Sequence, residues 1–511
     1  MNRRIAAAAA ALLTLAAAAS AAEPWVDAGP RADAGPRADV GSRGDVELRA
    51  DVEPRVGAEP WAEVSGTLGV AAMPEGRLPK AELDALVSVG ERLFAAKFTR
   101  LEGAGRPGAT QAIVPTPARA ADREAVARGR SLFQRMSGSD ANACVACHND
   151  PVPGGAGDFV TTTFVSEGFS NATFDTTDPQ FSNERGSNHL FGAGLIELLA
   201  REMSADLAAQ RIRALRKAEA SGKAVTVALE TKGVAFGSLA AAPDGTADLS
   251  GVDGVDPDLV VRPFGQKGVM TSLRQFSVNA GNHHMGLQAA ERFGRRWTGT
   301  DDHDGDGHRD EWGAADISAL VAWQATLPPP AVRVPDDARW RAAAARGSQL
   351  MDEWRCTVCH RRSLPLDSLV FADPGPLDAP GTLGARDVRR PGEYDLALLD
   401  WAKRLPRDPQ GRVLVPLWGD LKRHVMTDRT ENRLGNELLS QRFVERNEWA
   451  TAELWGVGST APYGHRNDMT TLDEVIRAHG GAAAGAKKRY VAATDAERSA
   501  VVAFLRTLVI E

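Results

Sequence analysis

The chain contains Cys144-Val-Ala-Cys147-His148 and Cys356-Thr-Val-Cys359-His360, two stretches with the pattern C-x-x-C-H. Together they hold all 4 cysteines of the sequence. The pattern is the attachment signature of c-type haem, in which two thiols bind the porphyrin and the next histidine ligates the iron. A four-cysteine zinc site or a thioredoxin-like dithiol would leave both trailing histidines unexplained. We therefore expect two covalently bound c-type haems, with His148 and His360 as proximal ligands.

The composition is that of a globular protein. The chain has 511 residues and a net charge of -7, which is enough length for two or three domains. Its 43% hydrophobic and 25% charged residues are ordinary proportions. Because the chain has no excess of basic residues, we expect no nucleic-acid partner.

The hydrophobic spacing predicts a mainly α-helical fold. Period-3.6 patterns predict helices at 80–99, 122–136, 194–220, 270–294, 337–354, 472–479 and 495–510. The β-branched stretch at 224–239 predicts a small strand or hairpin. We expect residues 361–418 to form loops.

The first 21 residues have the features of a secretory signal peptide. A basic start, Met1-Asn-Arg-Arg4, precedes an apolar run at 5–19 and a small-residue cleavage site, Ala19-Ser20-Ala21. The apolar run is too short to span a membrane, and no later stretch is long and apolar enough to do so. We therefore expect a periplasmic or secreted protein, which agrees with haem attachment outside the bacterial cytoplasm.

Residues 22–78 are predicted to form a disordered linker. A six-residue repeat rich in Asp, Gly, Pro and Arg covers 27–56 and offers almost nothing for a core. The expected haem domains follow at 79–327 and 337–511, joined by a Pro-rich connector at 328–336.

The stretch Asp302-His-Asp304-Gly-Asp306-Gly-His-Arg-Asp310 has carboxylates spaced as in a calcium-binding loop. Gly313 stands where an EF-hand carries its bidentate glutamate, although Glu311 could replace that ligand. The alternative is a solvated acidic turn that caps the helix expected from Ala314. We predict calcium or a similar hard cation as a possible ligand of this loop.

Over roughly residues 85–511 the chain resembles the bacterial di-haem cytochrome c peroxidase and MauG-like superfamily, and most closely its branch of di-haem oxidoreductases. The segments that carry the resemblance are Cys144 to Gly157, Phe191-Gly-Ala-Gly-Leu195, Arg262-Pro-Phe-Gly265, the acidic loop, Asp420 to Met426 and Leu454 to Gly481. The resemblance implies two cytochrome c-like haem domains with loop-rich insertions.

The resemblance also implies a distal ligand for the second haem. In the family, a Pro-Tyr-x-His segment is followed, after a short helix, by this ligand. Here His465 lies in that segment and His479 stands at the ligand position, with Met426 as the alternative. Two imidazoles would give a low-spin, six-coordinate haem of low potential that is closed to substrate.

The first haem has no clear sixth ligand, so we expect it to be the reactive one. A peroxidase needs a distal acid or base to move a proton between the peroxide oxygens. The candidates are Glu197, Glu167 and either His283 or His284. One of these two histidines could approach the distal face of the first haem, and His189 is a weaker rival for that place. The family's Phe-Trp-Asp-Gly-Arg-Ala segment between the haems is not found in this sequence.

These features predict an exported di-haem oxidoreductase. Electrons would enter at the C-terminal haem from a small redox protein or a quinol-linked donor. They would pass to the N-terminal haem, with Trp354 as a possible bridge, and reduce peroxide or a related oxidant there. The alternatives are a haem-dependent oxygenase acting on an apolar small molecule, similar to rubber-cleaving oxygenases, and a non-catalytic electron-transfer cytochrome.

Overall fold

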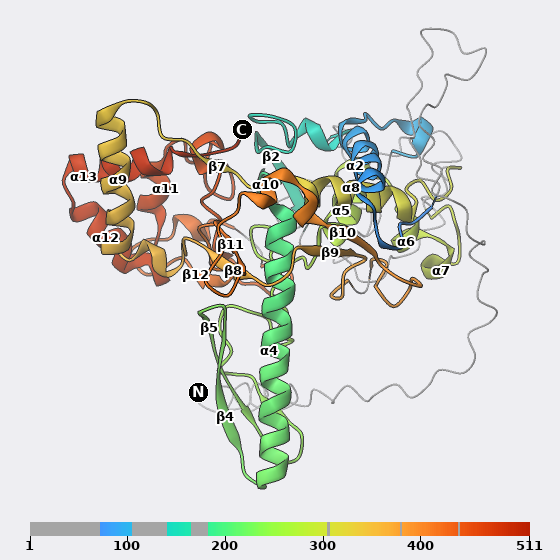
Figure 1. Ribbon diagram of the computed structural model, residues 1–511, viewed down its shortest axis with the longest axis horizontal. Coiled ribbons are helices and arrows are strands. Elements are labelled where there is room, and N and C mark those ends of the chain that lie inside the picture. Colours follow the sequence, from blue (N-terminus) through green and yellow to red (C-terminus); the bar gives the residue numbers. More distant parts are fainter. Residues whose placement is uncertain (1–71, 105–140, 165–181, 304–306, 379–380, 438–439) are drawn as a thin grey trace, which may run out of the picture. The chain divides into compact units, whose positions relative to one another are not determined.

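The computed structural model describes residues 72–104, 141–164, 182–303, 307–378, 381–437 and 440–511 (Figure 1). The chain divides into the units Met1–Asp45 and Val46–Glu511, and every described residue belongs to the second. The predicted signal peptide at 1–21, the repeat at 27–56 and the helix expected at 122–136 lie outside the described residues.

Helices carry more of the described chain than strands do. The α-helices are α2 (Lys80–Ala95), α4 (Ala193–Ser221), α5 (Leu273–Ala280), α6 (Ala290–Phe293), α7 (Arg295–Thr298), α8 (Ala314–Thr326), α9 (Ala338–Glu353), α10 (Asp400–Lys403), α11 (Leu472–Ala478), α12 (Ala484–Ala492) and α13 (Asp495–Leu505). The short 3-10 turns are η1 (Arg100–Glu102), η2 (Cys144–Ala146), η4 (Cys356–Val358), η5 (Leu396–Leu398), η6 (Arg433–Gly435), η7 (Val457–Ser459) and η8 (Gly481–Ala483), and η3 (Gly281–Met285) is a π-helix.

The strands form small sheets of two or three members. The three-stranded sheets are β1 (Gly76–Arg77) with β10 (Gly392–Asp395) and β9 (Val370–Asp373), and β4 (Val225–Thr231) with β5 (Val234–Ala241) and β6 (Ala247–Asp248). The pairs are β2 (Gly157–Phe164) with β3 (Ser182–Ser187), β8 (Leu364–Leu366) with β11 (Val413–Val415), β12 (Arg423–Val425) with β13 (Glu448–Ala450), and β7 (Ala331–Val332) with β14 (Leu508–Val509). The hairpin predicted at 224–239 is confirmed as β4 and β5.

Two of the predicted elements were wrong in part. The helix expected at 270–294 is interrupted, because α5 ends at Ala280 and gives way to the π-turn η3. The loops expected at 361–418 contain the strands β8, β9, β10 and β11. These strands are only three or four residues long, so they show no sequence periodicity of their own.

The strands between 364 and 415 contribute to the same hydrophobic core as α2, α4 and α8. Phe371, Tyr394 and Val415 are fully buried in that core. The guanidinium of Arg274 on α5 is also buried, and it forms ion pairs with Asp373 on β9 at 3.0 Å and with Glu291 on α6 at 2.5 Å. This network fixes the start of α5, which leads directly into η3.

Two helix crossings are built in the same way. In α2, a Cβ at Gly90 would lie 2.0 Å from the carbonyl oxygen of Ala319 on α8. In α9, a Cβ at Gly347 would lie 2.0 Å from the carbonyl oxygen of Ala500 on α13. Each glycine therefore permits a close backbone contact, and each helix precedes one C-x-x-C-H stretch in the chain. An aromatic residue flanks each contact, Trp323 on α8 and Phe504 on α13.

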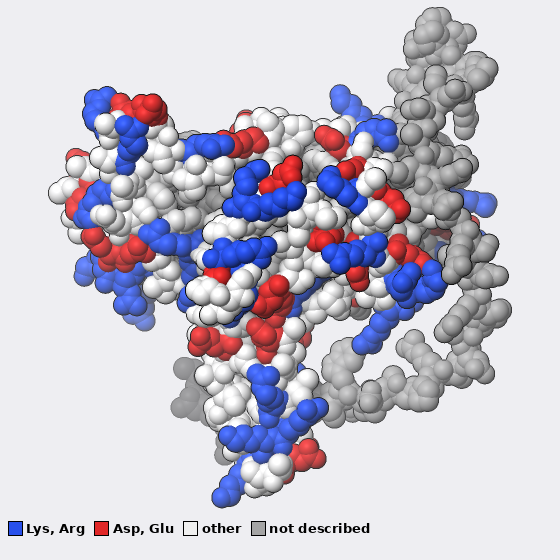
Figure 2. All heavy atoms as spheres, in the orientation of Figure 1, with Lys and Arg blue, Asp and Glu red and all other residues white. Residues whose placement is uncertain are grey.

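Charged side chains of both signs are interspersed on the face shown in Figure 2. Basic side chains gather at the C-terminal end of α4, where the exposed ones are Arg213, Arg216, Lys217 and Lys223.

Candidate functional site

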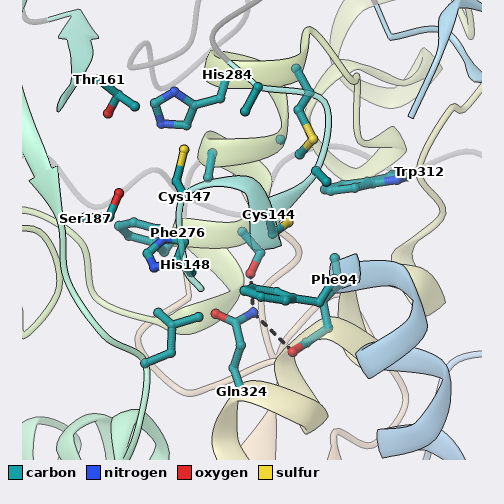
Figure 3. Close-up of a pocket in the computed structure, with 18 residues that line it drawn as sticks. Phe94, Cys144, Cys147, His148, Thr161, Ser187, Phe276, His284, Trp312 and Gln324 are labelled. Atoms are coloured by element: carbon teal, nitrogen blue, oxygen red, sulfur yellow. Dashed lines mark hydrogen bonds between the residues drawn. The ribbon is translucent and has the colours of Figure 1, made fainter. Parts of the chain in front are cut away.

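The first C-x-x-C-H stretch borders a cavity (Figure 3). The turn η2 places Cys144 and Cys147 on its wall together with His148. The empty space at this cavity, counting its open mouth, is about 640 Å³. Most of its remaining wall is apolar, including Phe94, Leu190, Phe276, Met285, Trp312 and Leu320.

The protonation of His148 suits a metal ligand. Its Nδ1 lies 2.8 Å from the carbonyl oxygen of Asn188, and because a carbonyl can only accept, Nδ1 donates the hydrogen bond. The lone pair of the ring is then on Nε2. Burial lowers the pKa of His148 to about 4, so the imidazole is neutral at neutral pH. A neutral ring with its second nitrogen bonded to a carbonyl is the usual state of a metal-bound histidine.

The π-turn η3 decides which of two neighbouring histidines reaches the cavity. His284 lines the cavity, whereas His283 is buried and is not among the lining residues. Their ring centroids are 4.6 Å apart. In Figure 3, His284 and Thr161 lie at one end of the cavity and Phe94 and Gln324 at the other. π-Bulges occur frequently at functional sites because they redirect side chains within a helix.

Glu197 lies on α4, away from the residues that line the cavity. One carboxylate oxygen accepts a hydrogen bond of 2.8 Å from the backbone N–H of Leu273 at the start of α5, and the other pairs with Arg201. Burial raises the pKa of Glu197 to about 7, against the lowering effect of Arg201. This arrangement holds the N-terminus of α5, the helix that continues into His283 and His284.

Replacing Glu197 by alanine is expected to destabilise the protein by about 3 kcal/mol, because it leaves Arg201 buried without its partner. Urea unfolding of the purified protein measures this loss. Glu219→Ala, an exposed position on the same helix, is the matched control and should change stability by less than about 0.5 kcal/mol. Equal stability of the two variants would contradict a structural role for Glu197.

At the second C-x-x-C-H stretch, the rings of His360 and His479 lie near each other, with their planes inclined at 55°. The Nδ1 of His360 donates to the carbonyl oxygen of Trp418 at 3.3 Å, and the Nδ1 of His479 donates to that of Val475 at 2.7 Å. Burial lowers the pKa of His360 to about 4 and lowers the pKa of His479 as well. The Nε2 atom of each neutral ring therefore carries the lone pair.

The separation of these rings fits a shared metal. Their centroids lie 6.4 Å apart. Two metal–imidazole bonds of about 2 Å each, with the radius of each ring added, give a separation of this size. The thioether of Met426 packs instead with Leu434, Trp449, Met469 and Ala478, while its carbonyl accepts a 3.0 Å hydrogen bond from the N–H of Gly480. The donor set therefore fits a haem iron between His360 and His479.

A charged pair stands beside this second site. His424, Asp420 and Cys359 offer ligand atoms that all lie within 4.8 Å of one another. The Nε2 of His424 donates to Asp420 at 2.9 Å. Burial would lower the pKa of His424, but the hydrogen bond to the Asp420 carboxylate and the free Cys359 thiol raise it; attachment of haem at Cys359 would remove the thiol and leave Asp420 as the raising partner. A protonated imidazole in this place suits an anionic neighbour such as a haem propionate.

The acidic loop is only partly described. Asp304 and Asp306 lie outside the described residues. Asp302 accepts a 3.1 Å hydrogen bond from the N–H of Gly307, and the backbone N–H of Asp310 donates to the carbonyl of Asp301 at 3.0 Å. Calcium binding stays a prediction.

Two neighbours of the acidic loop differ from expectation. His303 belongs to an acidic, polar stretch that predicts an exposed side chain, but it is buried against Phe293 with ring centroids 5.4 Å apart. The carboxylate of Glu311 accepts a 2.7 Å hydrogen bond from the N–H of Gln288. Both side chains thus have partners in the adjoining helical region.

Sequence reasoning missed the groups that orient the rings of His148 and His360, namely the carbonyls of Asn188 and Trp418, because any residue can supply a backbone carbonyl. It also named Trp354 as a possible bridge between the haems. Trp354 lies in the C-terminal core, with its ring edge-on to Tyr490 at 5.8 Å.

Comparison with known families matches residues 418–508 to "Di-haem oxidoreductase, putative peroxidase". This match includes His424, Met426, His465 and His479, and it confirms the suspected family for that part of the chain. No curated protein matches the chain. Among solved structures, a MauG-like protein associated with microbial copper homeostasis is similar at 15% identity and a TM-score of 0.33, covering 86% of this chain and 94% of that one.

None of the helices in the described ranges combines the length and the apolar character required to cross a bilayer.

Proposed function

We propose, on the premise that residues 418–508 carry a di-haem oxidoreductase domain, that this chain binds one c-type haem at each C-x-x-C-H stretch and reduces peroxide or a related oxidant. The observation that carries the proposal is the pair of neutral rings of His360 and His479, 6.4 Å apart. His360 and His479 would hold a haem iron from both sides, and such a site would be closed to substrate and would suit electron transfer.

The site at His148 suits the chemistry of the oxidant. When bound there, haem supplies iron that can reduce peroxide. The chain supplies His148 on one side and, at the cavity wall, His284, whose ring can take a proton from one peroxide oxygen and return it to the other. The apolar walls exclude water from this exchange.

Two cytochrome c-like haem domains are part of the proposal. The crossing of α2 on α8 at Gly90 and the crossing of α9 on α13 at Gly347 support it. The two contacts share a glycine, a facing alanine carbonyl and a flanking aromatic residue. Such correspondence is expected of a duplicated unit, in which each copy would hold one haem.

A haem-dependent oxygenase acting on an apolar small molecule is the second candidate. The observation that favours it is the predominantly apolar wall of the cavity at His148, where Phe94, Phe276 and Trp312 supply large aromatic faces. A haem bound at His148 would fill most of this cavity. An apolar substrate would then have to share the cavity with the haem, whereas peroxide is small and would take little of the space.

Electron paramagnetic resonance of the oxidised protein tests the proposal. We expect two haems per chain, one low-spin and one high-spin or ligand-exchangeable, with peroxide and cyanide altering only the second. Two low-spin centres that ignore both ligands would contradict both enzyme functions. An oxygen complex that persists in the protein as purified would favour the oxygenase.

We also propose export to the periplasm or the medium and a small redox protein or quinol-linked molecule as electron donor. The basic start and apolar run at 1–21 support export. Cell fractionation and N-terminal sequencing test it. A mature protein that retains Met1 in the cytoplasm would contradict it.

A further inference from the structure

Two segments that are far apart in the sequence cross at His189 and Trp455. The Nε2 of His189 donates a 3.0 Å hydrogen bond to the carbonyl oxygen of Trp455. Two glycines in the left-handed conformation make room for this crossing, Gly192 with φ 79° and Gly456 with φ 83°. A Cβ at Gly192 would lie 2.6 Å from the Trp455 ring, and one at Gly456 would lie 2.9 Å from the His189 ring. Each of the two crossing segments therefore needs a glycine for this contact to form.

One side of the crossing leads to the first proximal histidine. Asn188, whose carbonyl accepts the hydrogen bond of His148 at 2.8 Å, is covalently joined to His189. The position of Asn188 is fixed in turn by Gln266, whose Nε2 donates to the Asn188 side-chain oxygen at 3.3 Å and to the carbonyl of Gly186 at 3.0 Å.

The other side leads to the second proximal histidine. Leu454, covalently joined to Trp455, donates its backbone N–H to the carbonyl oxygen of Trp418 at 3.3 Å. The same carbonyl accepts the hydrogen bond of His360 at 3.3 Å. Covalent bonds and four hydrogen bonds therefore connect the ring of His148 to the ring of His360 without a through-space gap.

We propose that His189 and the Leu454–Trp455 peptide form the route by which electrons pass between the two haem sites. This inference rests on the proposed function. One electron leaves the site at His360, which is oxidised, and reduces the site at His148. A reduced redox protein replaces the electron, and peroxide or another oxidant consumes it. Each hydrogen stays on its donor, so the step moves no proton.

The chemistry of the crossing suits this role. Electron tunnelling decays less steeply along covalent and hydrogen bonds than across empty space. Burial lowers the pKa of His189 to about 4, so the ring is neutral and places no charge on the route. His189 touches neither proximal ring nitrogen through its own side chain, which makes it a positioning residue rather than a catalytic one.

The test is the rate of electron transfer between the haems after flash reduction of the holoprotein. We expect His189→Phe to abolish the fast phase of electron transfer between the two haem sites. Phenylalanine keeps an aromatic ring but removes the Nε2–H hydrogen-bond donor. His189→Gln, which keeps a donor, should restore it in part. His303→Phe, a buried histidine outside the route, is the matched control. Should the phenylalanine variant fail to fold, His189→Leu makes the same comparison.

Potentials and spectra separate the possible failures. The midpoint potentials and the low-spin signal should be the same in wild type and His189→Phe, so that a slower rate reflects the route and not the driving force. An unchanged rate in His189→Phe, with both haems present, would overturn the route alone. Loss of the fast phase in Trp455→Phe but not in His189→Phe would also overturn it, because the indole would then carry the electron. Absence of two haems from the wild type would overturn the proposed function itself.

Discussion

Replacing His479 by alanine is expected to convert the haem site at His360 from low-spin to high-spin. The ring centroids of His479 and His360 lie 6.4 Å apart, so a haem bound between the two rings would lose one protein ligand in this variant. The midpoint potential of this site should rise within the roughly 0.8 V range that axial ligands span, because imidazole stabilises ferric iron. Electron paramagnetic resonance and a redox titration measure both changes, and added imidazole should restore the low-spin signal.

The matched control for this variant is His465→Ala. His465 lies fourteen residues earlier, within the same matched region. Its ring stacks on Trp449 at 4.0 Å between centroids, so its loss should leave the low-spin signal in place. A low-spin signal that survives unchanged in His479→Ala would show that another residue is the ligand. Met426→Leu would then identify whether the thioether is that ligand.

Replacing Gly347 by alanine is expected to destabilise the protein by about 3 kcal/mol. The added Cβ would lie 2.0 Å from the carbonyl oxygen of Ala500 and 2.8 Å from the Cβ of Phe504. Neither atom is the end of a flexible side chain, so α9 and α13 must move apart. Urea unfolding of the holoprotein, followed by tryptophan fluorescence and by the haem absorbance, measures the loss.

Gly485→Ala is the control, and its expected change in the free energy of unfolding has the opposite sign. A Cβ at Gly485 on α12 would meet only the guanidinium of Arg489, at 3.9 Å. Alanine should therefore stabilise this helix by up to about 1 kcal/mol through its lower backbone entropy. If Gly347→Ala unfolds at the same urea concentration as the wild type, the close crossing of α9 and α13 is not a determinant of stability.

The parts of the fold that could be predicted are those with local signals. The C-x-x-C-H stretches, the 29-residue helix α4 and the hairpin of β4 and β5 each carry their pattern within one short segment. Asp337 is the N-cap of helix α9, and its side chain accepts hydrogen bonds from two backbone N–H groups of the first turn. Such signals need no knowledge of the rest of the chain.

The parts that could not be predicted depend on distant partners. β10 pairs with β9 on one side and with β1, more than 300 residues earlier, on the other. The choice between His283 and His284 depends on a π-turn, which shifts side-chain directions that a regular helix pattern would assign differently. Glu197 has the residue type of a catalytic acid. Its hydrogen bond from α4 to the start of α5 becomes visible only once α4 and α5 are in contact.

The pairing of β1 with β10 also has a consequence for the order in which the chain can fold. Gly76 lies opposite Gly392 in this parallel pair, so the loop between them must close before the sheet exists, and long loops close late. During synthesis, the core that contains α2, α4 and α8 lacks β9 and β10 until residue 395 has emerged. Cys144 and Cys147 are made long before that point. Both C-x-x-C-H stretches are therefore present in the growing chain before the strands that complete this core.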